Sequence, residues 1–368
     1  MKLNSISILN YKNIGEATLT FSPKVNCLIG NNGMGKTNIL DAIYYLSFCK
    51  SSTGQTDASV ITHDADFMML QGKYTRHDAD EDVSMGMQRG KRKTVRRGGK
   101  EYKRLSQHIG LLPLVMVSPA DWDLIRGAGE ERRKLMDMII SQGDKEYLAA
   151  VIAYTKAVEQ RNTIIKKEFR DPLLYETVEH QMATTAAYIH AARKRWIEAF
   201  EPIFMHYYNA IAGDGECVRM LYKSHLNEGS MLEHLNATRE RDFIIGYTTR
   251  GVHRDDIELL LGEHSMRKTG SQGQCKTYTI ALRLAQFEFL KEHTALTPIL
   301  LLDDIFDKLD ASRVESIIEV VSDERFGQIF ITDTNRTHLD EIVRRVSGDF
   351  AMFGVENGVC SLINRSNQ

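Results

Sequence analysis

The sequence predicts an α/β fold in which the two ends of the chain form one domain and the middle forms a helical arm. A short apolar strand runs into a glycine-rich loop and a helix near the N-terminus, and strand-like sequence returns after residue 245. Between about residues 120 and 245 the pattern changes to long helical periodicity with few glycines. We therefore expect a head in two parts, residues 1–119 and 246–368, and an arm, residues 120–245, inserted between them.

Short strands dominate the first part of the head. Alternating apolar residues over 2–21 predict a hairpin, and the apolar run 25–29 predicts a buried strand. Apolar residues at helical spacing predict a helix from Thr37 onward. Further strands are expected within residues 67–117.

The second part of the head repeats the pattern of strand and helix. Residues 243–249 and 257–261 have strand-like sequence, and 273–291 has helical spacing. The run 299–302 is apolar throughout and the run 328–332 is apolar at its centre, which is typical of strands buried on both faces. Parallel strands alternating with helices favour one α/β domain shared by both chain ends.

Composition limits the classes of function. The 368 residues are 42% apolar and 26% charged, which excludes a disordered or fibrous chain. With 47 basic and 49 acidic residues the net charge is −2, so a nucleic acid would have to meet a local basic patch. The N-terminus does not read as a signal peptide, no apolar run approaches the roughly 20 residues that span a bilayer, and the cysteines are scattered. We expect a soluble cytoplasmic protein with no membrane partner.

Residues 30–37 fit the phosphate-binding pattern G-x-x-x-x-G-K-[ST] between a strand and a helix. The glycines let backbone N–H groups face phosphate oxygens, Lys36 reaches the β- and γ-phosphates, and Thr37 can bind Mg²⁺. The pattern therefore predicts a site for a nucleotide such as ATP with Mg²⁺. The predicted cofactor-binding residues of this loop are Gly30, Asn31, Asn32, Gly33, Met34, Gly35, Lys36 and Thr37.

Two acids end the apolar strand at 299–302. Asp303 would hold Mg²⁺, and Asp304 stands where a carboxylate could orient or deprotonate an attacking water. Taken alone, two acids after a strand are more often an exposed turn or a helix cap. Together with the loop at 30–37 they favour a nucleotide-hydrolysing site, with Lys36 and Asp304 as its catalytic groups.

A third motif opens the helix predicted near residue 273. Ser271, Gly273 and Gln274 lie ahead of the acidic strand and resemble the signature motif of ABC-type ATPases. Alone, a serine and a glycine at a helix start are ordinary capping residues. The resemblance implies that this motif binds the γ-phosphate held by the opposite subunit, and that the loop 307–310 crosses the dimer interface.

Longer segments resemble one family, RecF, the bacterial recombination-repair ATPases. The segments are LNYKNIGEATLTFSP, DAIYYLSFCKS, VSPADWDLIRGAGEERRKLMDMIISQ, YTKAVEQRN, GVHRDD and SQGQCKTYTIALRLAQFEFL. The resemblance implies an ABC-type head with an arm, and a protein that binds DNA, dimerises on ATP and is a weak, DNA-dependent ATPase. It also implies action with RecR, and with RecO, to load RecA at single-strand gaps.

Some positions depart from the related patterns. Val252 replaces the proline usual in this family, which makes a rigid turn there less expected. Asp304 replaces the glutamate of transporter ATPases and is one methylene shorter, so we expect slow hydrolysis. Asp333 or Thr334 stands in place of the transporter switch histidine, which leaves the γ-phosphate sensor unassigned. Residues 118–122 stand in place of the usual glutamine loop.

One basic run is the first candidate for DNA contact. Residues 89–104 contain nine Lys or Arg and one Glu, and such a run gives salt-dependent binding without sequence preference. A solvated hairpin is the equal alternative, because charge runs usually face water. The nine residues are Arg89, Lys91, Arg92, Lys93, Arg96, Arg97, Lys100, Lys103 and Arg104.

Three further clusters carry weaker hypotheses. The basic run 132–134 is a second DNA candidate, and the pair at 207–208 could stack bases, although packing is the commoner role. His253 with Asp255 and Asp256 could bind a metal, but a turn before the next strand is favoured.

Other function classes share the phosphate loop. A transporter subunit is disfavoured by the arm and by the missing switch histidine, and a chromosome ATPase of the SMC type would need far longer heptad repeats. A small-molecule kinase needs no signature motif. The sequence therefore favours a DNA-repair ATPase that works as an ATP-dependent homodimer.

Overall fold

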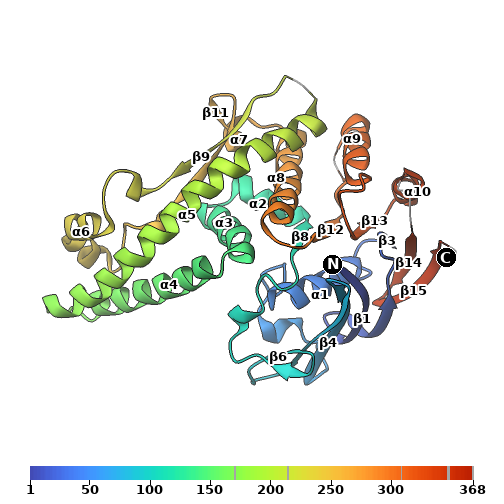
Figure 1. Cartoon of the computed structure of the whole chain (residues 1–368), viewed down its shortest axis with the longest axis horizontal. Coiled ribbons are helices and arrows are strands. Elements are labelled where there is room, and N and C mark those ends of the chain that lie inside the picture. Colours follow the sequence, from blue (N-terminus) through green and yellow to red (C-terminus); the bar gives the residue numbers. More distant parts are fainter. Residues whose placement is uncertain (170, 214, 308, 346–348, 367–368) are drawn as a thin grey trace. The chain divides into compact units, whose positions relative to one another are not determined.

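The computed structural model describes residues 1–169, 171–213, 215–307, 309–345 and 349–366. The chain forms two compact units (Figure 1). Unit 1 spans 1–121, 210–212 and 276–368, and unit 2 spans 122–209 and 213–275. The sequence prediction started the second part of the head at 246, whereas residues 246–275 belong to unit 2.

An antiparallel sheet forms the first layer of unit 1. Its order is β2-β1-β4-β5-β6-β7, and a turn at Gly98-Gly99 joins its last two strands. Buried and exposed residues alternate along β4, because one face of the sheet packs inward and the other meets water. The strands are β1 (Lys2–Tyr11), β2 (Ile14–Thr20), β4 (Phe67–Arg76), β5 (Ala79–Gln88), β6 (Thr94–Arg97) and β7 (Lys100–Glu101).

A mainly parallel sheet forms the second layer of unit 1. Its order is β15-β14-β3-β13-β12-β8, and only the β14–β15 pair is antiparallel. Both β12 and β13 are buried along their whole length, which explains the apolar runs 299–302 and 329–331 that precede their polar ends. The strands are β3 (Val25–Ile29), β8 (Leu114–Val117), β12 (Ile299–Asp303), β13 (Ile329–Asp333), β14 (Phe350–Glu356) and β15 (Val359–Arg365).

Helix α1 (Lys36–Phe48) packs against strands of both sheets in unit 1. It is buried on nearly every side, including Ile39, Leu40 and Ile43, so its apolar residues do not follow a single stripe. The helices α9 (Ala311–Val321) and α10 (Arg336–Arg345) follow β12 and β13, and neither was predicted from the sequence. The short turns of unit 1 are η1 (Asp57–Val60), η2 (Leu105–Gln107) and η3 (Pro119–Asp121).

Unit 2 is mostly helical, as predicted, but it also contains a small antiparallel sheet. The 41-residue α5 lies along α4, and a buried ion pair between Arg161 and Glu179 at 2.9 Å joins the two helices (Figure 1). The helices are α2 (Trp122–Arg126), α3 (Gly129–Gly143), α4 (Lys145–Lys166), α5 (Pro172–Ala212), α6 (Met231–Ile245), α7 (Met266–Thr269) and the first turn of α8 (Gln272–His293). Residues 210–212 of α5, and α8 from residue 276 on, belong to unit 1. The short turns are η4 (His225–Asn227) and η5 (Val252–Arg254).

The sheet of unit 2 has the order β11-β10-β9, with β9 (Val218–Lys223), β10 (Asp256–Leu261) and β11 (His264–Ser265). The pairing of β9 with β10 explains why residues after 246 join this unit. The strand predicted at 243–249 was wrong, because α6 continues to Ile245 and ends at Gly246, whose φ of 87° is a left-handed C-cap.

Among the described residues, no helix is both long enough and apolar enough to cross a membrane.

Candidate nucleotide site

The loop between β3 and α1 needs glycine at several positions, because its backbone leaves no room for a side chain or takes a conformation that favours glycine. Gly33 and Gly35 have φ values of 82° and 112°, in the left-handed region that favours glycine. A Cβ atom at Gly30 would lie 2.3 Å from the carbonyl oxygen of Val355. A Cβ at Gly35 would lie 2.9 Å from Oδ1 of Asn13. The glycine spacing read from the sequence therefore matches a steric need of this loop.

Lys36 brings a positive charge into the curve of the loop. Its Nζ donates to the carbonyl oxygens of Gly30 at 2.6 Å and Asn31 at 3.2 Å. The side chain is buried and starts the first turn of α1, so the ammonium group and the helix N-terminus act on the same space. Such a combination of backbone N–H groups, dipole and cation suits an anion of high charge.

Thr37 and Asp303 meet beside this loop. The Thr37 hydroxyl donates to Oδ1 of Asp303 at 3.0 Å, although the two residues lie on different elements, α1 and β12. The Thr332 hydroxyl, on the intervening strand β13, donates to the same oxygen at 2.7 Å. Burial raises the pKa of the Asp303 carboxyl, and its two hydroxyl partners oppose that rise.

Asp304 faces the phosphate loop. It lines a small pocket of about 130 Å³ together with loop residues between Asn31 and Asn38. Its φ of 46° is left-handed and therefore strained for a residue with a side chain, and its N–H donates to Thr332 Oγ1 at 3.0 Å. Burial raises the pKa of Asp304, while Lys36 opposes this and Asp333 adds to it.

The donor set at this edge fits Mg²⁺ and a phosphate chain. A hydroxyl from Thr37 and a carboxylate from Asp303 are the hard oxygen ligands that Mg²⁺ prefers, and they are already in hydrogen-bonding contact. Lys36 and the loop N–H groups supply positive charge on the adjoining side. The sequence-predicted residues of loop 30–37 and the two acids are thus brought together within unit 1.

Asp333 and His338 together occupy the position of the missing switch histidine. Asp333 ends β13 and lies in register with Ile29, the last residue before the phosphate loop. His338, near the start of α10, turns back so that its Nδ1 lies 2.8 Å from Oδ2 of Asp333. Its ring also packs against Phe306, with centroids 5.1 Å apart. A histidine therefore reaches the end of this strand from further along the chain.

Asn13 is a site residue that sequence reasoning missed. Its Oδ1 accepts from Nδ2 of Asn38 at 2.7 Å, and its Nδ2 donates to the carbonyl of Met34 at 3.4 Å. The neighbouring Lys12 forms an ion pair at 2.6 Å with Asp41, which is fully buried in α1. The turn between β1 and β2 thus supports the phosphate loop from the side. A polar turn after an apolar strand was the only signal, and it is common in hairpins.

The signature-like motif belongs to unit 2. Ser271 and Gln274 form a reciprocal cap: the Gln274 N–H donates to Ser271 Oγ at 3.2 Å, and the Ser271 N–H donates to Gln274 Oε1 at 2.9 Å. Gln274 Nε2 also donates to Glu216 at 2.8 Å. Ser271 is exposed, whereas Gln274 is engaged within its own unit. Of the loop 307–310, Lys308 lies outside the described residues.

Three of the nine basic residues of the candidate DNA patch are bound within the protein. Arg89 donates to five backbone carbonyls between residues 58 and 65. Lys93 donates to Asp57 at 2.8 Å and to the carbonyl of Cys49 at 2.5 Å, and Arg97 forms a bidentate pair with Glu81. The remaining six are exposed: Lys91, Arg92, Arg96, Lys100, Lys103 and Arg104.

The weaker candidates have structural partners within unit 2. Arg132 forms a bidentate pair with Asp256 at 2.7 and 2.9 Å, Arg133 donates to the carbonyl of Asp255, and Lys134 pairs with two glutamates of its own helix. The tyrosines at 207 and 208 are buried, as packing requires. Residues Val252–Arg254 form the short turn η5 just before β10, as the favoured interpretation of residues 253–256 predicted. No group of three or more His, Cys, Asp or Glu side chains that could hold a metal occurs among the described residues.

Comparisons with known proteins cover nearly the whole chain. A family model described as RecF/RecN/SMC N terminal domain matches residues 2–359. The DNA replication and repair protein RecF of Parabacteroides distasonis is 54% identical over 358 residues, 97% of this chain and 98% of that protein. The protein of that name from Bacteroides thetaiotaomicron is 52% identical over 361 residues, 98% of both chains. A solved structure of the recombination mediator protein RecF-ATP in the RecFOR pathway is 26% identical, covers 99% of this chain and 98% of that one, and has a TM-score of 0.89.

Proposed function

The chain belongs to the RecF family, and we propose that it is a DNA-binding ATPase of recombinational repair. The observation that carries this proposal is the hydrogen bond between Thr37 and Asp303, which joins the phosphate loop to the acidic strand beside a pocket that Thr37 and Asp304 line. A kinase or transporter subunit would use the same pocket. The near-complete similarity to RecF proteins favours repair over both.

In this proposal the residues of loop 30–37 hold the phosphates of ATP. Lys36 would exchange its two carbonyl partners for phosphate oxygens, since all three of its N–H groups can rotate toward the loop. Thr37 and Asp303 would hold Mg²⁺, which neutralises phosphate charge when it is bound. The structure of the relative named RecF-ATP supports ATP as the nucleotide.

Asp304 is proposed to orient the attacking water and accept its proton. The carboxylate borders the pocket of the phosphate loop, and it is one methylene shorter than the glutamate of transporter ATPases. A shorter side chain at the end of a strained backbone reaches less far toward the water, so hydrolysis should be slow. Slow hydrolysis suits a switch whose ATP-bound state must persist.

Dimerisation on ATP is proposed to follow from the exposed motif at the start of α8. The Ser271 hydroxyl and the N–H group of Gly273 lie at the N-terminus of a helix, where a phosphate held by a second subunit would find donors and a favourable dipole. Gln274 would support this motif through its reciprocal cap with Ser271.

The proposed partners are gapped or junction DNA, RecR and RecO, with RecA acted on indirectly. The relative described as a mediator in the RecFOR pathway supports the two protein partners. The six exposed basic residues of the run 89–104 supply the DNA contact, because Lys and Arg neutralise phosphates irrespective of base sequence.

Two variants test the ATP-dependent dimer. Ser271→Arg should abolish dimerisation with ATP and Mg²⁺ in sedimentation velocity, while binding of a fluorescent ATP analogue by the monomer stays within about threefold. Lys36→Ala is the matched control, and it should lose analogue binding and dimerisation together. Unchanged dimerisation of Ser271→Arg would remove the contact across the interface from the proposal.

DNA binding is tested by fluorescence anisotropy of labelled gapped duplex, with and without ATP and Mg²⁺, at two salt concentrations. ATP should strengthen binding, and raising salt from 50 to 200 mM should weaken it steeply because released counterions drive the association. No binding in any condition would contradict DNA recognition by this chain alone.

A further inference from the structure

Strand β9 leaves one edge of the small sheet of unit 2 without a strand partner. It pairs with β10 from Val218 opposite Leu261 to Lys223 opposite Asp256, and no described strand lies on its other side. The N–H of Met220 donates to Oε1 of Glu201, on α5, at 2.8 Å instead of to β10. Because backbone groups alternate in direction along a strand, alternate residues including Met220 and Tyr222 direct their N–H and C=O groups to this open edge.

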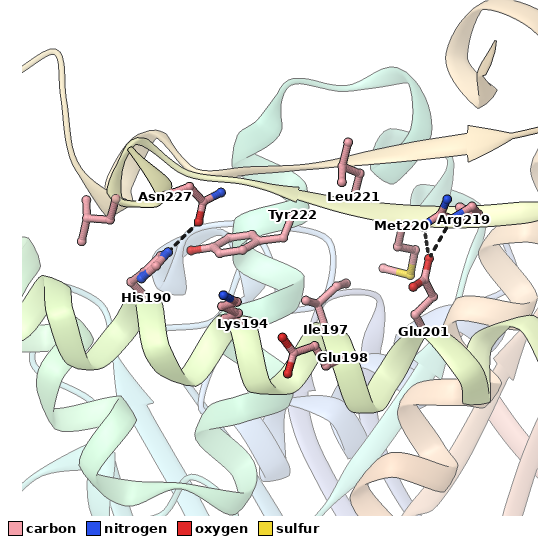
Figure 2. A pocket seen from close by; sticks show the side chains of 11 residues that line it. His190, Lys194, Ile197, Glu198, Glu201, Arg219, Met220, Leu221, Tyr222 and Asn227 are labelled. Carbon is pink, nitrogen blue, oxygen red and sulfur yellow. Dashed lines mark hydrogen bonds and ion pairs between the residues drawn. The ribbon is translucent and has the colours of Figure 1, made fainter. Parts of the chain in front are cut away.

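A pocket of about 460 Å³ runs along this edge between β9 and α5 (Figure 2). Its inner wall contains the buried side chains of Ile197, Met220 and Tyr222. The Tyr222 hydroxyl donates to Asp255 at 2.5 Å, and Arg193 donates to the same carboxylate oxygen at 2.7 Å. These buried bonds hold β9 in place, so its edge is formed before any partner binds.

Charges are arranged in order along the helical wall of the pocket. His190 and Lys194 lie toward the Tyr222 end, and Glu198 and Glu201 lie toward the Met220 end (Figure 2). Lys194 and Glu198 are four residues apart on a helix, which is about 6 Å along its axis. Side chains two residues apart on one face of a strand are about 6.6 Å apart. The spacing of Lys194 and Glu198 along the helix therefore matches the spacing of alternate side chains along a strand.

We propose that this edge and groove bind an extended segment of a partner protein, which adds to β9 as a further strand. The segment carries an acidic side chain facing Lys194 and a basic side chain, two residues along, facing Glu198. Strand addition satisfies the open backbone groups, and the charge order sets which sequences fit. This binding is separate from the nucleotide and DNA contacts proposed above, and it needs neither.

Glu201 now occupies the place of a partner carbonyl. Its carboxylate accepts from the Met220 N–H, and it lies 3.9 Å from Nε of Arg219. An incoming strand would bring its own carbonyl to Met220 and release the Glu201 carboxylate to face the basic side chain of the segment. A charged residue placed across an open edge also discourages unspecific strand pairing in the free protein.

The charge pattern disfavours other classes of ligand. The charged residues that line the pocket balance one another, Lys194 and Arg219 against Glu198 and Glu201, so a polyphosphate or nucleic acid backbone gains little attraction in the groove. A row of alternating backbone donors and acceptors is instead what an extended polypeptide satisfies. A second copy of this chain is the competing occupant, and the test below separates it.

The probes are two labelled heptapeptides, Thr-Val-Asp-Val-Lys-Val-Thr and Thr-Val-Lys-Val-Asp-Val-Thr, titrated by fluorescence anisotropy with the full chain and no nucleotide. We expect one order to bind about fivefold to tenfold more tightly, because each peptide can satisfy both charges in only one strand direction. The double variant Lys194→Glu with Glu198→Lys should reverse that preference. Arg195→Glu, at an exposed neighbour that does not line the pocket, is the matched control and should leave it unchanged.

Peptide N-methylation tests strand addition separately from charge. Methylating the alternate residues whose N–H groups face β9 should abolish binding, and methylating the intervening residues should leave it within about threefold. Equal affinity for the two charge orders, equal effects of the two methylated sets, or no binding at 1 mM peptide would each overturn the proposal. Self-association of the chain that the double variant removes would assign the groove to a second copy and would also overturn it.

Discussion

The hydroxyl of Thr332 donates to Oδ1 of Asp303 at 2.7 Å and accepts the N–H of Asp304 at 3.0 Å. One side chain on β13 thereby holds both acids of the neighbouring strand, one by its carboxylate and the other by its backbone. Asp304 adopts a left-handed conformation, and this conformation points its N–H at the Thr332 hydroxyl. A residue in an ordinary extended strand would point its N–H in another direction.

Thr332→Val should therefore damage both stability and hydrolysis. The substitution keeps the shape of the side chain but leaves the part-buried N–H of Asp304 without its partner and removes one donor from the buried Asp303 carboxylate, at a cost of about 1–3 kcal/mol. Thermal unfolding of the nucleotide-free protein and steady-state ATP hydrolysis measure the two effects. Thr332→Ser keeps the hydroxyl and should retain most of both, and a serine variant as impaired as the valine variant would contradict this role.

The basic hairpin should divide into residues that bind DNA and residues that hold the fold. Replacing Arg92, Arg96 and Lys100 by alanine should weaken gapped-DNA binding and lower the slope of log K against log salt, with little change in unfolding temperature. Lys93→Ala should instead destabilise the protein by about 1–3 kcal/mol, because Asp57 and the Cys49 carbonyl lose a charged donor. If the triple variant lost stability and kept its affinity for DNA, the hairpin would have a purely structural role.

The sequence of the run 89–104 alone could not separate its DNA-binding residues from its structural residues. Arg89 and Lys93 look like their neighbours in sequence, and only the folded positions of the carbonyls between residues 58 and 65 commit Arg89 to a structural role. The phosphate loop was predictable because all of its residues are contiguous and its glycines answer a local steric need. The role of Thr332 was not predictable, because it depends on β13 lying between β3 and β12 in the sheet.

The arm shows the same contrast between local and distant information. Its helices follow from periodicity, and β9 was missed even though Val218, Met220 and Tyr222 alternate with exposed residues. An alternation over six residues is too short to identify a strand when helical sequence lies on both sides. Pairing with β10, more than thirty residues later, is what makes this segment a strand.

Acid should destabilise unit 2 through His253. Its Nε2 lies 3.1 Å from the carbonyl of Thr248, so Nε2 carries the proton and Nδ1 accepts from the Tyr154 hydroxyl at 2.8 Å. Burial lowers the pKa of His253 to about 4. The unfolded chain, with a histidine pKa near ~6.5, binds the proton first as pH falls, so stability is lost between about pH 6.5 and pH 4.

Two measurements check the state of His253. Its ring carbons should titrate near pH 4 in NMR spectra of the labelled protein, and His253→Asn identifies the signal by its loss. The asparagine variant should also lose part of the acid destabilisation seen in thermal unfolding between pH 6.5 and 4. A His253 that titrates above pH 6 would contradict the buried neutral tautomer.

His338 should control hydrolysis without controlling ATP binding. Its Nδ1 donates to Asp333, which lies in register with the residue before the phosphate loop, on the strand between that loop and Asp303. His338→Phe keeps an aromatic ring against Phe306 but removes the donor to Oδ2 of the buried Asp333 carboxylate, while the Asn335 N–H still donates to Oδ1 at 2.8 Å, so more of the negative charge of Asp333 acts on Asp304. We expect a fall of about tenfold or more in kcat with the affinity for a fluorescent ATP analogue unchanged within about twofold. His338→Asn retains a donor near the position of Nδ1 and should recover part of the rate. Loss of analogue binding in the phenylalanine variant, or equal rates in both variants, would show that the pair acts on the fold of this edge and not on hydrolysis.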